Sequence, residues 1–151
     1  MYQRILVPVD GSPTSERGLA EAIRLARSGG GQIRLMHVVD ELAYALGTAG
    51  SFGGGSADLF TLLREAGQAI LDKARATVVA EQVAVDTVLA DTFAGRLCDQ
   101  VVAQAKSWPA DLIVIGTHGR RGVGRLVLGS DAEQILRLAP VPVLLVRAAE
   151  G

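Results

Sequence analysis

The sequence predicts a single α/β domain over residues 1–151, with a five-stranded parallel sheet in the order 3-2-1-4-5 and helices on both faces. Short apolar runs alternate along the chain with segments of helical periodicity, which is typical of a doubly wound sheet. The apolar runs are nearly continuous, as expected for strands covered on both faces. At 151 residues the chain suits one domain with a substantial core.

The predicted strands are short runs dominated by Val, Ile and Leu. They comprise residues 4–9, 33–39, 83–89, 112–115 and 141–146. The first helix is expected to start at Ser12 and Pro13, a capping residue followed by a proline suited to the first turn, and to stop at Gly29–Gly31. Further helices are predicted at about residues 58–81, 94–107 and 130–138. The stretch Ala43–Ser56, which contains the glycine-rich part Gly47–Gly55, is predicted to be a mobile surface loop.

The composition limits which binding partners and which cellular compartment are expected. Apolar residues make up 49% of the chain and aromatic residues 4%, so the core must be aliphatic. The formal net charge of −1 provides no general attraction to nucleic acid or anionic membranes, and neither is predicted as a partner. The lone Cys98, expected on an apolar helix face, excludes an internal disulfide. No signal segment is recognised and no apolar run approaches the roughly 20 residues of a membrane span, so a cytoplasmic location is expected.

The segment from Gly116 to Ser130 is the strongest functional signal. It follows the apolar run 112–115 and ends where a helical pattern begins. Glycine allows backbone N–H groups to approach an anion closely, and the first turn of a helix presents unpaired N–H donors. Arg120, Arg121 and Arg125 add positive charge. This combination favours phosphate binding.

The end of the first predicted strand also has a polar residue suited to ligand binding. Asp10 follows the first predicted strand directly. Ligands of doubly wound sheets bind at the carboxyl ends of strands where the strand order reverses. If the first and fourth strands are neighbours, Asp10 and the Gly116–Ser130 segment face each other across one crevice.

Other phosphate-binding motifs are excluded. The chain has no Walker A pattern, and its only lysines, Lys73 and Lys106, lie on predicted helices. No Gly-x-Gly-x-x-Gly follows the first strand. The Ser-Gly-Gly-Gly run at 28–31 follows a helix, so it is interpreted as a helix end rather than a pyrophosphatase loop.

The spacing Gly116-x2-Gly119-x9-Gly129-Ser130 resembles the ATP-binding branch of the universal stress protein family, which is marked by Gly-x2-Gly-x9-Gly-Ser/Thr after the fourth strand. The resemblance extends along nearly the whole chain. It includes residues 5–12, His37 and Val38, residues 116–120 and the closing run 141–146.

The resemblance implies roles for individual residues. Pro8 and Val9 would shape an adenine pocket, Asp10 would bind ribose or help to hold a metal ion, and Val39 would provide a backbone contact to adenine. The residues implied to surround the triphosphate are Gly116, Gly119, Gly129 and Ser130. Thr117, His118, Arg120 and Asp131 complete the predicted contacts.

The polar residues Asp131, His118 and His37 each have a distinct expected role. Asp131 departs from the family, which more often has an apolar residue or Thr after the Ser. Its carboxylate would repel a triphosphate, so we expect it either to point away or to make nucleotide binding depend more on Mg²⁺ or Mn²⁺. His118 is not predicted to be catalytic, because no nucleophile–base–carboxylate set can be assembled around it. His37 is expected to be a core histidine with a satisfied hydrogen bond.

The predicted function is that of an ATP-binding protein of stress response or signalling, with Mg²⁺ or Mn²⁺ as companion ion. Slow or absent hydrolysis is expected, because the chain lacks a Walker lysine and a recognisable water-activating base. The resemblance also implies a homodimer through strand Val143–Val146. Two alternatives remain: a nucleotide-free partner-binding module of the same fold, and an adenine-nucleotide hydrolase cleaving between the α and β phosphates. The hydrolase would require a Ser-Gly-Gly loop after the first strand, where this chain has Asp10-Gly11-Ser12-Pro13.

Overall fold

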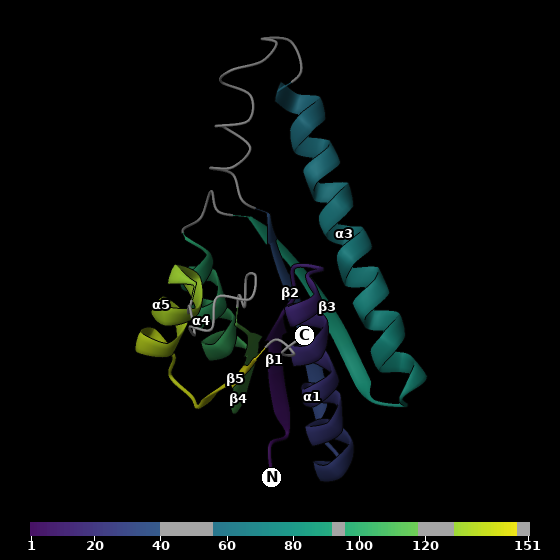
Figure 1. Cartoon of the computed structure of the whole chain (residues 1–151), viewed down its shortest axis with the longest axis vertical. Coiled ribbons are helices and arrows are strands. Elements are labelled where there is room, and N and C mark those ends of the chain that lie inside the picture. The colour runs from purple at the N-terminus through teal and green to yellow at the C-terminus, as the bar shows by residue number, and fades with distance from the viewer. Residues whose placement is uncertain (40–55, 92–95, 118–128, 148–151) are drawn as a thin grey trace.

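A computed structural model describes residues 1–39, 56–91, 96–117 and 129–147. Five strands alternate with helices along these ranges (Figure 1). The strands are β1 (Arg4–Pro8), β2 (Gln32–Val39), β3 (Ala84–Asp91), β4 (Leu112–Gly116) and β5 (Val143–Val146). The helices are α1 (Pro13–Gly29), α3 (Ser56–Ala80), α4 (Leu97–Ser107) and α5 (Ser130–Leu138).

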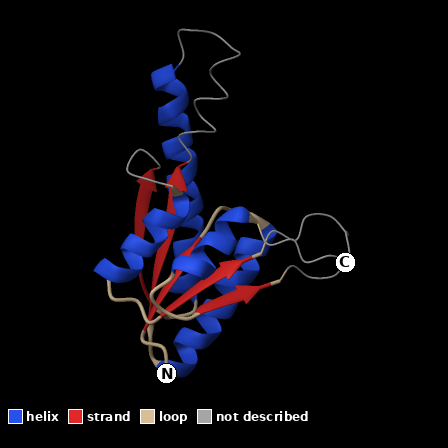
Figure 2. Ribbon diagram, turned by 90° about the vertical axis from the view of Figure 1, so that its left-hand side faces the viewer, coloured by secondary structure: helices blue, strands red, loops and turns tan. Residues whose placement is uncertain are grey.

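The strands form one sheet in the order β3-β2-β1-β4-β5, as predicted. Every neighbouring pair is parallel, and Figure 2 shows the strands fanning out in a common direction. Ile5 of β1 is in register with Ile33 of β2 on one side and with Leu112 of β4 on the other. The order runs in one direction from β1 to β3 and in the other from β4 to β5, so it reverses between β1 and β4.

Helices cover both faces of the sheet, with α1 and α3 on one face and α4 and α5 on the other (Figure 1). Successive side chains of a strand point to opposite faces. Ile5 and Val7 of β1 accordingly pack with α1 and α3, whereas Leu6 packs with α4 and α5. Cys98 lies on the buried face of α4, as expected, and is 2% exposed.

The ends of α1 agree with the sequence prediction. The Ser12 Oγ accepts a hydrogen bond of 3.1 Å from the Ser15 N–H, and Pro13 occupies the first turn. Gly30 ends the helix with φ of 69°, a conformation that glycine adopts without a steric penalty. The Ser28–Gly31 run is therefore a helix end, as interpreted from the sequence.

Several predicted boundaries were wrong by a few residues. The last strand begins at Val143 rather than Val141. Pro142 has no N–H to donate, and only its carbonyl joins the sheet, accepting a 3.0 Å hydrogen bond from the Ile113 N–H. The strand β3 extends to Asp91, and α4 begins at Leu97 rather than near residue 94. Of the predicted loop Ala43–Ser56, residues 43–55, including Gly47–Gly55, lie outside the described residues, and Ser56 begins α3.

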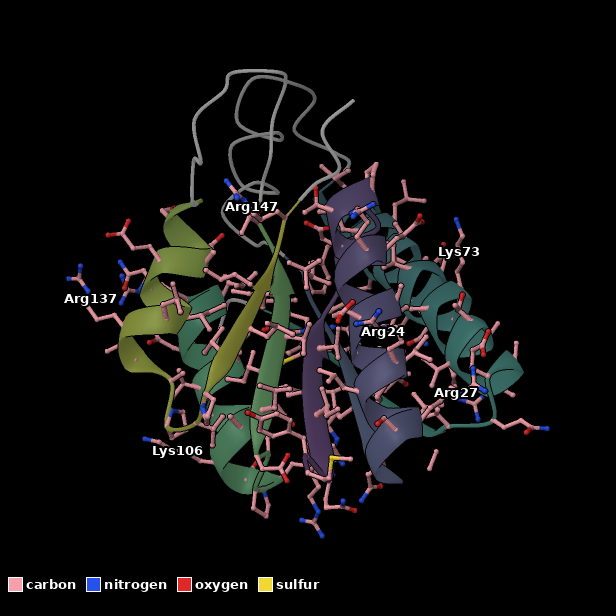
Figure 3. All side chains as sticks on the ribbon, turned by 60° about the horizontal axis from the view of Figure 1, so that its bottom comes forward. Arg24, Arg27, Lys73, Lys106, Arg137 and Arg147 are labelled. Atoms are coloured by element: carbon pink, nitrogen blue, oxygen red, sulfur yellow. The ribbon has the colours of Figure 1, made fainter. Side chains whose placement is uncertain are left out.

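Basic side chains are spread over the outside of both helical layers. Arg24, Arg27 and Lys73 lie over α1 and α3, whereas Lys106 and Arg137 lie over α4 and α5 (Figure 3). Within the described ranges, no helix combines the length and the apolar character needed to cross a membrane.

Candidate functional site

The carboxyl ends of β1 and β4 lie side by side at the point where the strand order reverses. This is where ligands bind in open parallel sheets. The turn that follows β1 leads into α1, and α5 begins at Ser130, beyond the end of β4. The predicted adjacency of the first and fourth strands is thus confirmed.

The turn between β1 and α1 is held by hydrogen bonds among its own residues. The Asp10 Oδ1 accepts from the Ser12 N–H at 2.9 Å, and the Ser15 Oγ accepts from the Asp10 N–H at 3.2 Å. Gly11 between them has φ of 81°, which disfavours other residues. Asp10 itself is exposed, and its Oδ2 has no hydrogen-bond partner within the described ranges. A carboxylate fixed in this way can accept a hydroxyl or help to bind a cation.

A hollow of about 130 Å³ lies between this turn, the ends of β2 and β4, and the first turn of α5. Five of the predicted nucleotide contacts line it, namely Pro8, Val9, Asp10, Gly116 and Asp131. The other lining residues were not predicted as contacts: Ser12, Ser15, Met36, His37, Val38, Leu97, Ile115, Ala132 and Ile135. The walls are mainly apolar, and the polar groups come from the β1–α1 turn, His37 and Asp131.

The remaining predicted contacts lie outside this lining. Val39 is 2% exposed and pairs in register with Asp91, whereas its neighbour Val38 reaches the hollow. Thr117 is 3% exposed, and its N–H donates to the Val146 carbonyl at 2.9 Å. Gly129 and Ser130 stand at the start of α5. His118, Gly119 and Arg120 lie outside the described residues.

Gly116 has a structural reason to be glycine. A Cβ atom there would lie 2.7 Å from the Thr14 carbonyl carbon and closer still to its oxygen. The first turn of α1 therefore packs directly against the end of β4. This contact brings the two halves of the candidate site together, whatever the site binds.

The first turn of α5 offers backbone donors. Gly129 is the capping residue, and no side chain of the described residues caps the helix. Free N–H groups at a helix start, with the helix dipole behind them, favour an anion. The Asp131 carboxylate stands in the same turn and lines the same hollow as Asp10. Two carboxylates beside an anion site favour a companion cation.

Cys98 lies close to this region and is buried on α4. Burial raises the pKa of its thiol, and the neighbouring Asp99 carboxylate raises it further. Within the described ranges, no group of three or more His, Cys, Asp or Glu side chains could hold a metal ion.

A second hollow, of about 430 Å³, lies between α1 and α3 on the other side of the β1–α1 turn. Its lining shares Val9, Gly11 and Ser15 with that turn, and a 3.4 Å ion pair between Lys73 and Glu16 lies at its edge. Of the predicted contacts, only Val9 lines it. The smaller hollow is therefore the better candidate site, because the predicted residues converge there.

The comparison with known proteins decides the family. A model of the universal stress protein family matches residues 1–147. The chain belongs to this family. Universal stress protein A homolog 2 of Coxiella burnetii is 34% identical over 147 residues, which cover 97% of this chain and 95% of that protein. A universal stress protein of Methanocaldococcus jannaschii is 33% identical over 148 residues, 97% of this chain and 83% of that protein.

Solved structures of universal stress proteins have the same fold. One from Burkholderia pseudomallei is 30% identical, with a TM-score of 0.77 over 98% of this chain and 97% of that one. One from Archaeoglobus fulgidus, in complex with dAMP, has a TM-score of 0.68 at 23% identity, covering 96% and 98%. Another, in complex with cAMP, has a TM-score of 0.67 at 23% identity, covering 98% of both chains.

Proposed function

We propose that this universal stress protein binds ATP in the crevice between the β1–α1 turn and the start of α5. The proposal rests on the fact that predicted contact residues from distant parts of the sequence line the same hollow. Pro8–Asp10, Gly116 and Asp131 come from three separate parts of the sequence and line one hollow at the reversal of strand order. The dAMP and cAMP bound by two structural neighbours support an adenine nucleotide as the ligand class.

The apolar part of the hollow suits adenine. Pro8, Val9, Met36, Val38 and Ile115 contribute to its walls. A volume of about 130 Å³ is less than the roughly 300–1,000 Å³ of whole ligand sites, so we assign only the base to it. The ribose then lies beside Asp10, whose carboxylate accepts its hydroxyls.

The triphosphate is assigned to the start of α5 and the glycine-rich segment before it. Gly129 and Ser130 bring free backbone N–H groups and one hydroxyl to the phosphates. Gly119 and Arg120 belong to the same proposed phosphate site through the motif. Because Asp10 and Asp131 both line the hollow, Mg²⁺ or Mn²⁺ accompanies the nucleotide and offsets their repulsion of the phosphates.

The proposed role is nucleotide-dependent stress response or signalling, with slow or no hydrolysis. A fast phosphoryl-transfer enzyme needs a residue that positions the attacking water, and the sequence offers none in this motif. We also propose a homodimer through β5, which lies at the edge of the sheet with four half-buried apolar residues. An apolar edge strand is stabilised when a second strand pairs with it.

The test is to denature freshly purified protein and identify the released nucleotide by chromatography. Released ATP is the expected result. Release of AMP, together with pyrophosphate formation from added ATP, would instead favour the hydrolase. Protein that releases no nucleotide and binds none in a titration with Mg²⁺ would contradict the proposal and favour the partner-binding module.

A further inference from the structure

His37 contacts Val9, the residue that directly follows β1 at the candidate site. Its Nδ1 lies 2.8 Å from the carbonyl oxygen of Val9, which is 6% exposed. Because a carbonyl oxygen can only accept, Nδ1 carries the proton in this hydrogen bond. Because Val9 lies beyond the end of β1, its buried carbonyl is bonded by the His37 side chain at the carboxyl edge of the sheet. The N–H of Val9 bonds to the Met36 carbonyl at 2.8 Å, on the same strand as His37.

The peptide unit between Val9 and Asp10 is consequently held at both of its polar ends. His37 donates to its oxygen, and the Ser15 Oγ accepts from its N–H at 3.2 Å. The orientation of this peptide sets where the Asp10 side chain leaves the backbone. The Asp10 Oδ1 then bonds to the Ser12 N–H, which completes the turn. A loss of the His37 hydrogen bond would leave a buried carbonyl unpaired, which favours rotation of the peptide toward another donor.

Gly67 of α3 provides the room that this imidazole occupies. A Cβ atom on Gly67 would lie 2.6 Å from His37 Cδ2 and 3.1 Å from His37 Nε2. Glycine in the interior of a helix is less favourable than alanine. At this buried position the ring of His37 is the nearest obstacle, and Leu89 Cδ1 lies 3.1 Å from the same Cβ position. The imidazole is thus confined between α3 and the carbonyl that it bonds.

We propose that His37 is a positioning residue of the nucleotide site, which fixes the Val9–Asp10 peptide so that Asp10 faces the ribose, with Gly67 as its steric partner. This inference rests on the proposed ATP site. It assigns a task to a histidine that the sequence predicted only as a satisfied core residue. It also extends the binding determinants to α3, which supplies no residue to the lining of the smaller hollow.

The first test replaces the donor and then restores it. His37→Leu keeps the bulk but removes the hydrogen bond, and we expect ATP to bind about three- to tenfold more weakly. His37→Asn carries an amide nitrogen that can reach the position of Nδ1, and it should restore affinity close to that of the wild type. Hydrogen exchange of the Asp10 amide should be faster in His37→Leu and not in His37→Asn. An affinity of His37→Leu equal to that of the wild type would overturn the inference.

The second test uses the contact with α3. Gly67→Ala should weaken ATP binding when His37 is present, because the added methyl group displaces the ring. In a His37→Ala background the same substitution should weaken binding much less, because the ring is gone and the added methyl group meets the flexible end of Leu89 at 3.1 Å. Equal effects of Gly67→Ala in both backgrounds would contradict the coupling, because a general disturbance of α3 acts independently of the ring.

These outcomes are distinct from failure of the proposed function. If the wild type binds ATP and the His37 variants bind it equally well, only the positioning role is wrong. If the wild type binds no nucleotide, the ATP proposal is wrong, and positioning for the nucleotide falls with it. Exchange of the Asp10 amide, measured without ligand, then still reports whether His37 holds the peptide.

Discussion

Gly116 at the end of β4 packs directly against the carbonyl group of Thr14 in the first turn of α1. A Cβ on Gly116 would lie 2.7 Å from the Thr14 carbonyl carbon and 2.9 Å from its Cγ2. Gly18 lies one turn further along α1. A Cβ atom on Gly18 would lie 3.3 Å from the backbone nitrogen of Gly116. The absence of side chains on both residues lets α1 lie close to the strand end that forms the candidate site.

Gly116→Ala is therefore expected to destabilise the fold. The methyl group would collide with backbone, which cannot rotate away as a side chain can, and overpacking of this kind costs about 1–3 kcal/mol. Thermal unfolding followed by circular dichroism measures the effect. Gly29→Ala is the matched control, because a Cβ there meets chiefly the exposed side chain of Met1. A wild-type melting temperature for Gly116→Ala would contradict this packing.

Gly129→Val is expected to separate binding from folding. Gly129 has φ of −58° and ψ of 153°, which any residue can adopt, so the loss of stability should stay near 1 kcal/mol, as for a poorer capping residue. The valine side chain would nevertheless fill the space assigned to the phosphates. Calorimetric titration should detect no ATP binding by a variant that unfolds nearly as the wild type does. Unchanged affinity would mean that the phosphates bind elsewhere.

Asp131→Ala should change the dependence of ATP binding on divalent cations. The exposed Asp131 carboxylate lies in the first turn of α5, where it competes with the phosphates for the helix start. Removal of Mg²⁺ with EDTA should weaken ATP binding to the wild type more than to Asp131→Ala. Equal losses in the two proteins would exclude Asp131 as the origin of the metal dependence.

Arg34→Lys tests an ion pair on the α4 side of the sheet. The Arg34 guanidinium donates to both carboxylate oxygens of Asp86 at 2.8 Å and lies 4.7 Å from the centre of the Trp108 ring. The hydrogen bonding of Arg34 to the Asp86 carboxylate raises the pKa of Arg34. Lysine keeps the charge but loses the paired hydrogen bonds to Asp86 and the stacking on Trp108. Because Asp86 is half exposed, we expect the free energy of unfolding to fall by only about 1 kcal/mol.

Trp108 is the only tryptophan of the chain, so its fluorescence reports on this contact directly. Arg34→Lys should change the emission of the native protein. Arg24→Lys is the control, because Arg24 pairs with Glu21 on the exposed side of α1. Identical emission from all three proteins would contradict the stacking.

Cys98 should resist thiol reagents in the native protein. Burial and then the Asp99 carboxylate raise the pKa of its thiol, so the reactive thiolate is scarcer than in an ordinary cysteine at the same pH. Labelling should be slow in buffer and fast in urea. Raising the pH through the ordinary thiol range should accelerate labelling of the unfolded chain far more than that of the native one. Rapid stoichiometric labelling without urea would contradict the burial.

The sequence predicted the sheet order correctly, and it predicted the helix positions well because these depend on local patterns. The apolar runs that became β1, β2 and β4 are nearly continuous, and the Ser12–Pro13 and Gly30 signals mark the ends of α1 by local backbone chemistry. The start of β5 was missed because Val141 and Pro142 are apolar like the strand. Apolar character alone does not reveal where ladder hydrogen bonds begin.

The candidate site was predictable only in part, because its geometry depends on packing between distant segments. Asp10 and Gly116 were found from their places after apolar runs. The reason for Gly116 was not, since contact with Thr14 requires the placement of α1 on the sheet. Val38 rather than its neighbour Val39 lines the hollow, because successive residues of β2 face opposite sides of the sheet. A polar residue near the carboxyl end of a predicted strand was the available signal for His37.

The central claim is that ATP binds between the β1–α1 turn and the start of α5. The most direct measurement is calorimetric titration of the nucleotide-free wild type and of Gly129→Val with ATP in the presence of Mg²⁺. We predict one saturable site per chain in the wild type and no heat of binding in Gly129→Val, with both proteins folded. Absence of binding by the wild type, or equal affinity in the two proteins, would contradict the claim.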